Sequence, residues 1–268
     1  ALTAQAAEGL SSFTRDLLAG ASDVDAGETQ TLVVGSMKFT VGSGEPGTAA
    51  PGGVVVSGST LTVDPSNAAF DDLAVGEQRV IRVDYDVVDV HGARVPQSLT
   101  LTITGTNDAV SVGYATNAGT VTEDAASYAP QATSTTFNPD GPSFSAGASG
   151  VASGTISFVD VDLSDTHTLS FSGPTTGALG TFSVGAPNEY EGSAYGWASW
   201  TYTIDNTKTQ SLAAGQKVTE TYTVTVSDGH GSTTTQDVVI TIVGTNDAPK
   251  AVGALLNPGS VREGYAPL

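Results

Sequence analysis

The stretch QRVIRVDYDVV at residues 78–88 decides the fold class of this chain. Apolar and polar residues alternate along it. One face takes Ile81, Val83, Tyr85 and Val87, and the other takes Arg82, Asp84 and Asp86. A period of two indicates a strand of an antiparallel sheet with one buried face. The stretches SLTLTITG, ETYTVTVS and DVVITIVG repeat the pattern. The sequence therefore predicts an all-β chain.

Short blocks recur in the same order in the two halves, which indicates two copies of one domain. The pairs are SDVDAGET with VDVDLSDT, LTVD with YTID, DLAVGEQ with SLAAGQK, VDVHG with SDGHG, and GTNDA twice. We expect tandem β-sandwiches at residues 1–106 and 107–246. Residues 130–150, rich in Pro, Gly, Ser and Thr, predict a loop inserted into the second copy. Only residues 11–20 have a local helical character.

The two ends of the chain complement each other. Residues 247–268 follow the second GTNDA as TVTED and its surroundings follow the first, which aligns Glu263 with Glu123. These residues are expected to form the first strand of a following repeat, or a donor strand for a neighbouring subunit. The first copy is expected to lack its own first strand unless a preceding unit supplies it. An arbitrary boundary of the sequence is the alternative reading.

Composition restricts the partners of the chain. There are 28 Asp and Glu against 9 Lys and Arg, a net charge of −19. This balance argues against nucleic acid and anionic membranes, which need clustered basic residues. The absence of cysteine excludes disulfides and cysteine-type zinc sites, and no apolar run has the length of a membrane span. The abundance of Thr, Ser, Gly and Val is typical of an extracellular protein of the bacterial cell surface.

Carboxylates gather where the domains should meet. In a sandwich of about seven strands, the loop between the second and third strands and the last hairpin lie at the end where the preceding linker arrives. For the second copy, these three segments carry Asp160, Asp162, Asp165, Asp228, Asn107 and Asp108. Calcium takes about six to eight such oxygen ligands. The sequence therefore predicts Ca²⁺ at this junction.

The other ends of the domains extend the predicted set. After the second copy, the expected ligands are Glu123, Asp205, Asn246 and Asp247, which would meet Asp23, Asp25 and Asp89 of a following unit. At the first junction, Asp64 matches Asp205, and the glutamate would be Glu263 of a preceding unit, with Glu8 as a weaker substitute. The alternative is that these Asp and Asn residues only form turns and cap backbone amides.

Taken together, the blocks resemble the cadherin-like (VCBS-type) tandem repeats of bacterial type I-secreted RTX adhesins. The matching stretches are TVTED, ASGTISFVDVDLSD, WTYTIDN, YTVTVSDGHGS and VVITIVGTNDAP in the second copy, and LLAGASDVDAGE and LTITGTNDA in the first. The resemblance covers nearly the whole chain. It implies cadherin-like, immunoglobulin-like Greek-key sandwiches placed end to end. Secreted rhizobial adhering proteins, which bind acidic exopolysaccharide with calcium, are similar in their domain layout.

Three functions remain open at this point. The first is a calcium-rigidified extender in an adhesin that serves adhesion, aggregation or biofilm formation. The second is a calcium-dependent lectin for bacterial exopolysaccharide, with Tyr195 and Trp197 in a glycine-rich turn as sugar platforms. The third is a filament subunit that joins neighbouring subunits of the same protein through its tail strand.

Other motifs do not indicate an enzyme. GSGEPG at residues 42–47 has the glycine spacing of a nucleotide loop but opens no helix. His91 and His230 sit in hairpin loops, where they bind a metal or simply supply turn polarity. Trp200 and Tyr202 share a strand face and are predicted to belong to the core. No residue is marked as a nucleophile.

Overall fold

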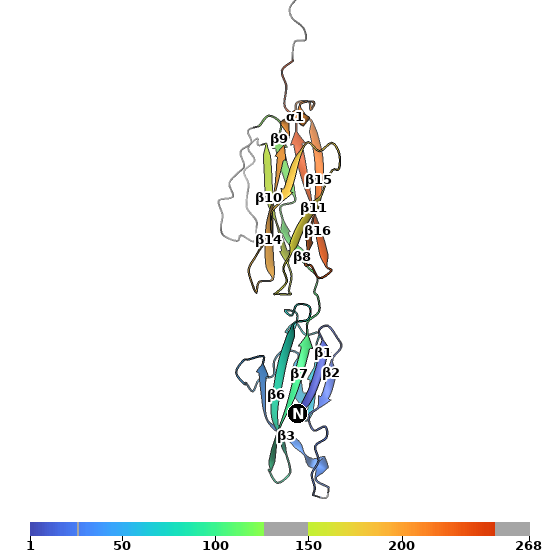
Figure 1. Cartoon of the computed structure of the whole chain (residues 1–268), viewed down its shortest axis with the longest axis vertical. Coiled ribbons are helices and arrows are strands. Elements are labelled where there is room, and N and C mark those ends of the chain that lie inside the picture. Colours follow the sequence, from blue (N-terminus) through green and yellow to red (C-terminus); the bar gives the residue numbers. More distant parts are fainter. Residues whose placement is uncertain (26, 126–149, 250–268) are drawn as a thin grey trace, which may run out of the picture.

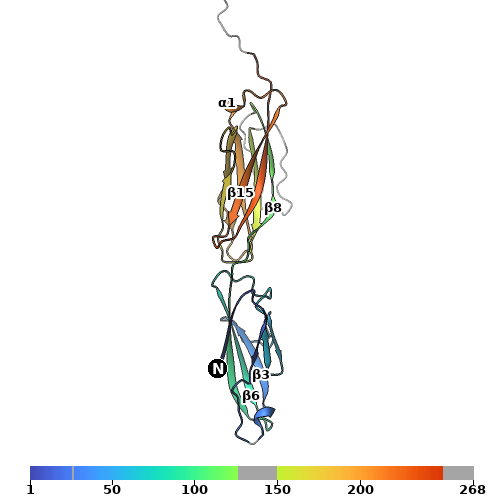
Figure 2. The same cartoon turned by 90° about the vertical axis from the view of Figure 1, so that its right-hand side faces the viewer.

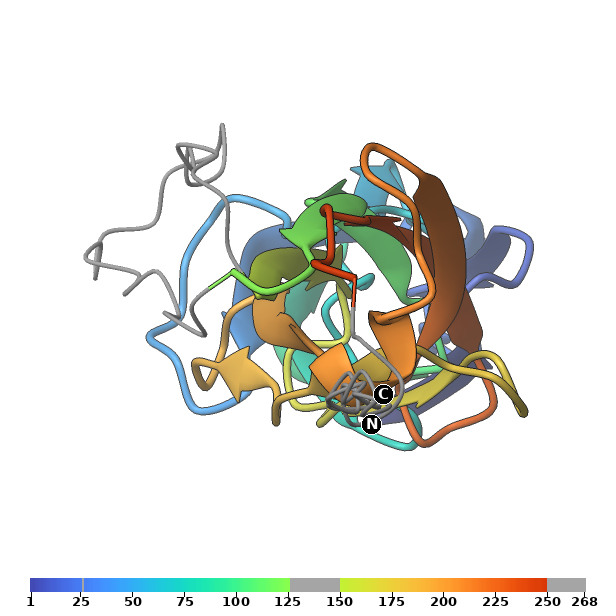
Figure 3. The same ribbon diagram turned by 90° about the horizontal axis from the view of Figure 1, so that it is seen from above.

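Two β-sandwiches follow one another along the long axis of the molecule (Figure 1). The computed structural model describes residues 1–25, 27–125 and 150–249. Seen along this axis, the second sandwich lies in front of the first (Figure 3). The predicted all-β class with tandem sandwiches is confirmed. The described helical elements are short, α1 (Asn206–Thr209) and the 3₁₀ turn η1 (Thr29–Thr31).

The first sandwich packs a four-stranded sheet, in the order β1-β7-β6-β3, on a three-stranded sheet, β2-β5-β4. Its strands are β1 (Leu2–Ala7), β2 (Phe13–Asp16), β3 (Val33–Val41), β4 (Val54–Ser57), β5 (Thr60–Val63), β6 (Gln78–Val88) and β7 (Arg94–Thr104). The β6–β7 hairpin is the longest pairing, and it runs in register from Gln78 opposite Thr104 to Val88 opposite Arg94.

The second sandwich repeats this arrangement with additions. One sheet has the order β12-β14-β10-β8, with β13 also paired to β14, and the other has the order β11-β15-β16-β9. Its strands are β8 (Ser111–Ala115), β9 (Ala118–Thr122), β10 (Val151–Val159), β11 (Thr168–Ser172), β12 (Gly180–Val184), β13 (Asn188–Glu189), β14 (Tyr195–Ile204), β15 (Lys217–Ser227) and β16 (Thr233–Val243). Both strand orders are those of immunoglobulin-like Greek keys.

The first copy contains the strand β1, whereas the sequence predicted that its first strand is missing or supplied by a preceding unit. β1 pairs in parallel with β7, as β9 pairs in parallel with β16, so the two strands are equivalent. Among the described strands, those without a counterpart in the first sandwich are β8, which pairs with β10, and the short β13, which pairs with β14. The first residues of the chain therefore form a strand of the first sandwich that the comparison of the two copies did not predict.

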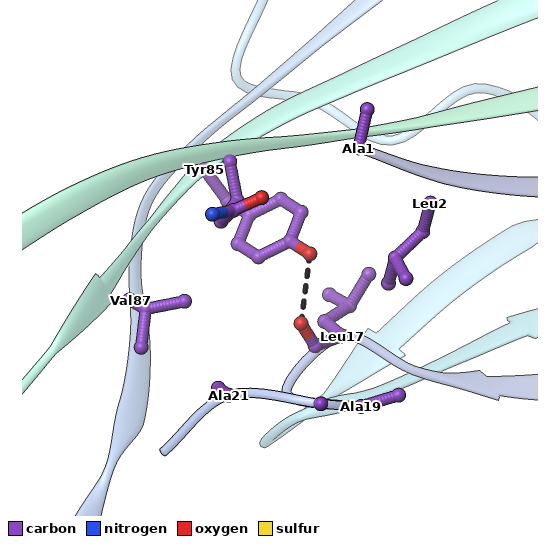
Figure 4. Close-up of a pocket in the computed structure, with 9 residues that line it drawn as sticks. Ala1, Leu2, Leu17, Ala19, Ala21, Tyr85 and Val87 are labelled. Carbon is purple, nitrogen blue, oxygen red and sulfur yellow. Dashed lines mark hydrogen bonds between the residues drawn. The ribbon is translucent and has the colours of Figure 1, made fainter. Parts of the chain in front are cut away.

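A pocket of about 160 Å³ marks the place that corresponds to β8 in the first sandwich (Figure 4). Leu2, Leu17 and Val87 line it, and the Tyr85 hydroxyl donates a 2.7 Å hydrogen bond to the carbonyl of Leu17. In the second sandwich, Val226 takes the position of Val87 and packs with Val110 and Phe158. The two sandwiches thus close this side differently.

Two separate cores hold the sandwiches. The first is aliphatic around Phe70, with Leu61, Ile81 and Leu99 fully buried. The second is aromatic, with Phe182 stacked between Trp200 and Tyr222. Trp200 and Tyr202 have no exposed surface, which confirms their predicted place in the core.

The remaining fold predictions have mixed outcomes. Residues 11–20 do not form the helix that their composition favoured, because Phe13–Asp16 pair with β5 as β2. Residues 126–149 and 250–268 lie outside the described residues. The predicted loop at 130–150, the strand of a following repeat and Glu263 therefore fall almost wholly there.

Candidate metal centre

The linker after β7 meets two loops of the second sandwich (Figure 2). The side-chain amide of Asn107 donates to Asp228 Oδ2 at 3.1 Å. The backbone N–H of Asp108 donates to Asp162 Oδ2 at 2.8 Å. Asp162 lies in the β10–β11 loop, and Asp228 begins the turn between β15 and β16. Three chain segments therefore converge at the junction between the sandwiches.

Gly105 fixes the direction in which the linker leaves the sheet. A Cβ at this position would meet the carbonyl oxygens of Leu73 and Ala74, and Gly244 packs in the same way against Leu212 and Ala213. The glycine of GTNDA is therefore required by close approach of two backbone segments.

The carboxylates at the junction are buried. Asp160, Asp162 and Asp228 are 3%, 2% and 1% exposed. Two oxygens, Asp162 Oδ1 and Asn107 Oδ1, are buried without a hydrogen-bond partner in the described part of the chain. An unpaired buried polar atom costs about 1–3 kcal/mol. These two atoms are the unsatisfied acceptors of the junction in the described part of the chain.

Burial also alters the acidity of the cluster. It raises the pKa of Asp162 to about 6, and the charges of Asp160 and Asp165 add to the rise, against the N–H of Asp108. Burial likewise raises the pKa of Asp108. For Asp228, burial acts in the same direction. Its hydrogen bonds outweigh that effect and lower its pKa.

The first sandwich contributes two acids that the sequence undervalued or missed. Glu8 is 7% exposed and accepts a hydrogen bond from the Thr106 N–H at 3.1 Å. Burial raises its pKa, the Thr106 hydrogen bond lowers it, and the nearby charges of Asp108, Asp71 and Asp72 raise it further. Asp71 also raises the pKa of Asp108. Glu8 thus contacts the linker, and Asp71 lies near enough for its charge to act on Asp108.

Glu8 is the structural equivalent of Glu123 rather than a weaker substitute. Each follows the strand that pairs in parallel with the last strand, and each accepts a hydrogen bond from the threonine N–H of GTNDA, at Thr106 and Thr245. Each also precedes a residue with positive φ, Gly9 or Asp124. In the sequence, this equivalence could have been noticed from a glutamate followed by a residue that tolerates positive φ. The match between EG at residues 8–9 and ED at residues 123–124 is hard to see because only the first copy has glycine there.

The trailing end of the second sandwich is built like the junction below it but less acidic. Glu123 is 1% exposed, and Gln210, at the position of Asp71, donates to Asp124 Oδ1 at 3.2 Å. Asn246 and Asp247 are exposed, and the Asn246 amide donates to the Asp247 carbonyl at 3.3 Å.

The carboxylates of Asp64 and Asp205 serve local turns. Asp64 Oδ1 accepts from the N–H and hydroxyl of Ser66. Asp205 Oδ1 accepts from the hydroxyl and N–H of Thr207, which lowers the pKa of Asp205 and caps α1. These contacts match the turn-forming alternative for acidic residues, and the described hydrogen bonds do not tie either residue to a linker.

The leading end of the first sandwich carries the equivalent of the β10–β11 loop. Ligand atoms of Asp23, Asp25 and Glu28 lie within 4.8 Å of one another. Glu28 was missed, although SDVDAGET places it opposite Asp165 of VDVDLSDT. Asp89 Oδ1 accepts from the N–H groups of His91 and Ala93, as Asp228 Oδ1 does in the other hairpin.

The histidines divide into two kinds. His230 Nδ1 lies 2.9 Å from Asp165 Oδ2, and this hydrogen bond raises the pKa of His230. His91 Nε2 lies 3.3 Å from Glu28 in the same arrangement. The side chain of His91 is 74% exposed and that of His230 is 44% exposed. His167, which the sequence did not single out, is buried and contacts Asp160 at 3.0 Å.

The candidate sugar platform lies in a strand rather than in a turn. Tyr195 and Trp197 belong to β14, where they alternate with buried Gly196 and Ala198. They are 62% and 37% exposed. The glycine between them is part of the sheet because it opposes Phe158.

No protein-family model and no curated protein matches the chain. Solved structures similar to it include the EC1-3 fragment of mouse clustered PcdhgC3, at 13% identity and a TM-score of 0.45, over 91% of this chain and 65% of that one. Zebrafish RET cadherin-like domains 1 to 4 match at 14% identity and 0.37, over 90% and 47%. Titin domains z1z2, in complex with telethonin, match at 10% and 0.32, over 91% and 94%.

The chain thus spans less than two thirds of these two cadherin-type structures. At these identities and TM-scores, the fold is defined by the strand order of the chain itself. Within the described residues, no helix is long and apolar enough to cross a membrane.

Proposed function

We propose that this chain is a calcium-rigidified repeat segment of a secreted or cell-surface bacterial adhesin. Its role is mechanical, because it extends a fibre and sets the angle between successive sandwiches. The bacterial origin rests on the sequence resemblance to VCBS-type repeats. The observation that carries the calcium proposal is the pair of buried, unpaired oxygens on Asp162 and Asn107.

The donors at the junction suit calcium. The acidic and amide side chains described at the junction offer carboxylate or amide oxygen, the ligand type of a hard cation. The residues that would hold it are Glu8, Asp71, Asn107, Asp108, Asp160, Asp162 and Asp228. Bound calcium would neutralise part of the net negative charge of −19. It also satisfies the unpaired oxygens.

The chain's own residues explain why such an ion would stiffen the molecule. Glu8 and Asp71 belong to the first sandwich, Asn107 and Asp108 to the linker, and Asp162 to the second sandwich. An ion shared by the three segments ties both rigid bodies to the peptide between them. Without it, the carboxylates repel one another, and the hydrogen bonds of Asn107 and Asp108 hold the angle against that repulsion.

Small-angle scattering of the whole chain, with calcium and with a chelator, tests the proposal. We expect an extended, narrow distribution of lengths with calcium and a broader one without it. Asp108→Asn should remove much of the calcium response. Glu45→Gln changes the same charge in an exposed loop of the first sandwich and should leave the response intact. An identical distribution with and without calcium would rule out the rigidifying role.

A calcium-dependent lectin is the second candidate. It is favoured by the exposed rings of Tyr195 and Trp197 on one face of β14, because aromatic rings can stack on sugars. Glycan-array binding that disappears in Tyr195→Ala and Trp197→Ala would support it. Binding that persists in both variants would assign the glycan to another surface.

A further inference from the structure

His167 is a buried side chain held between two carboxylates. Its Nε2 lies 3.0 Å from Asp160 Oδ2, and its Nδ1 lies 2.5 Å from Glu189 Oε1. Only 4% of the side chain is exposed, and the ring packs on Phe158 with centroids 4.7 Å apart. The ring is therefore fixed from two sides and from one face.

Both carboxylate oxygens of Glu189 form hydrogen bonds with His167. Oε1 contacts the ring, and Oε2 accepts from the backbone N–H of His167 at 3.2 Å. Glu189 lies in β13, which pairs with β14 opposite Gly196. A Cβ at Gly196 would meet the ring of Phe158. The glycine thus allows the close packing that brings Glu189, Phe158 and His167 together.

The result is an Asp160 carboxylate whose orientation is determined before any ion arrives. Its Oδ1 accepts from the Asp162 N–H at 3.1 Å, and its Oδ2 faces His167. A carboxylate held at both oxygens keeps its remaining lone pairs in a fixed direction. Partners that orient a metal ligand in this way typically strengthen metal binding by about 10–100-fold.

The leading end of the first sandwich lacks this support. Asp23 Oδ1 accepts from the Asp25 N–H at 2.9 Å, just as Asp160 does from Asp162. However, Gln30 stands where His167 stands, and β4 and β5 are joined by a two-residue turn in place of the segment that carries Glu189. Asp23 is accordingly half-buried.

We propose that His167, held by Glu189, is a positioning residue that preorganises Asp160 for a divalent cation. As a consequence, the junction binds calcium more tightly than the acidic cluster at Asp23, Asp25 and Glu28. The inference rests on the proposed function, since it assigns calcium to the junction. It adds that the two equivalent ends of the sandwiches are occupied in sequence as calcium rises, the junction first.

Calcium titration of the full chain, followed by amide NMR shifts, tests this site by site. The N–H of Asp108 reports the junction, and the N–H of Asp25 reports the leading end, because each bonds a cluster carboxylate. In the unmodified chain, we expect the Asp108 signal to respond at lower calcium. His167→Ala and Glu189→Gln should weaken the junction by about 10–100-fold and leave the Asp25 response unchanged.

Two further variants separate positioning from general damage. His167→Gln keeps a donor near the position of Nε2 and should recover part of the affinity lost in His167→Ala. His91→Gln alters an exposed histidine at the other cluster and should leave the Asp108 response unchanged. Native shifts of Val224 and Ile240, in the core of the second sandwich, identify the variants that still fold.

The outcomes distinguish this inference from the function on which it rests. If calcium moves neither signal in the unmodified chain, the proposed calcium role fails. If the junction binds calcium but folded His167→Ala and Glu189→Gln bind it as well as the unmodified chain or better, the positioning role alone is overturned. Simultaneous saturation of both signals in the unmodified chain also overturns it.

Discussion

The two sandwiches have the same strand order but different interiors. In the second, the Glu220 carboxylate is buried and accepts from the hydroxyls of Tyr202 and Tyr222 at 2.9 and 2.8 Å. The equivalent residues of the first sandwich are Leu61, Ile81 and Val83, all fully buried. One Greek key therefore tolerates either an apolar core or a satisfied polar network. A buried carboxylate without its hydroxyl partners is expected to destabilise the fold.

The largest loss of stability is expected when a carboxylate is placed in the core of the first sandwich without its hydroxyl partners. Ile81→Glu places a charge in a core without a hydroxyl to meet it. We expect a loss of about 4 kcal/mol or more in unfolding free energy, confined to the first sandwich. Calorimetry that resolves two transitions measures it. Val80→Glu, one position along on the outward face, is the control and should change little.

The metal-free junction gives the next largest effect. The pKa of Asp162 is raised to about 6 in the folded chain, above its unfolded value of about 3.9. The folded state therefore holds more protons between these values, and its stability falls as pH rises through them. We expect Asp162 to cost about 2–3 kcal/mol at pH 7 without calcium.

Unfolding in chelator at several pH values measures that cost against Asp162→Asn. The variant should become more stable than the unmodified chain as pH rises from about 4 to about 6, the interval set by the two pKa values, and should remain so at about pH 7. Calcium should reverse the order at pH 7, since the amide is a poorer ligand. A constant difference across this range would contradict the assigned burial of Asp162.

Loss of the charged acceptor in the second core is expected to be slightly smaller. Glu220→Gln places an amide N–H₂ toward hydroxyl or backbone donors, among them the N–H of Leu179. We expect about 2 kcal/mol of destabilisation, confined to the unfolding transition of the second sandwich. Glu220→Gln with Tyr222→Phe should recover part of it, because one competing donor is removed. No recovery would mean that the network is not the cause.

The pocket of the first sandwich gives the smallest effect. Tyr85→Phe removes one hydrogen bond, to the carbonyl of Leu17, and should cost about 1 kcal/mol. Chemical denaturation of the first sandwich measures it. Tyr114→Phe, at an exposed tyrosine of the second sandwich, is the control and should change less.

The site could be predicted as far as local repetition carries information. Alternation in residues 78–88 and 220–227 located the strands, and the matched blocks located Asp160, Asp162, Asp228, Asn107 and Asp108 at one end. The structure links Asn107 to Asp228, Asp108 to Asp162, and Asp162 to Asp160 by hydrogen bonds. Asp64 and Asp205 could not be separated from them, because a turn-capping aspartate and an ion-facing one look alike in sequence.

The sequence by itself determined that this chain forms two Greek-key sandwiches with acids where they meet, because strand periodicity and turn residues act over short distances. Only the tertiary structure decided which acids are buried, and that Glu8, Asp71, Glu28 and the His167–Glu189 pair belong with them. The reason is physical: pairing across 22 residues, as between His167 and Glu189, depends on how strands lie in the sheet. No local pattern records that distance.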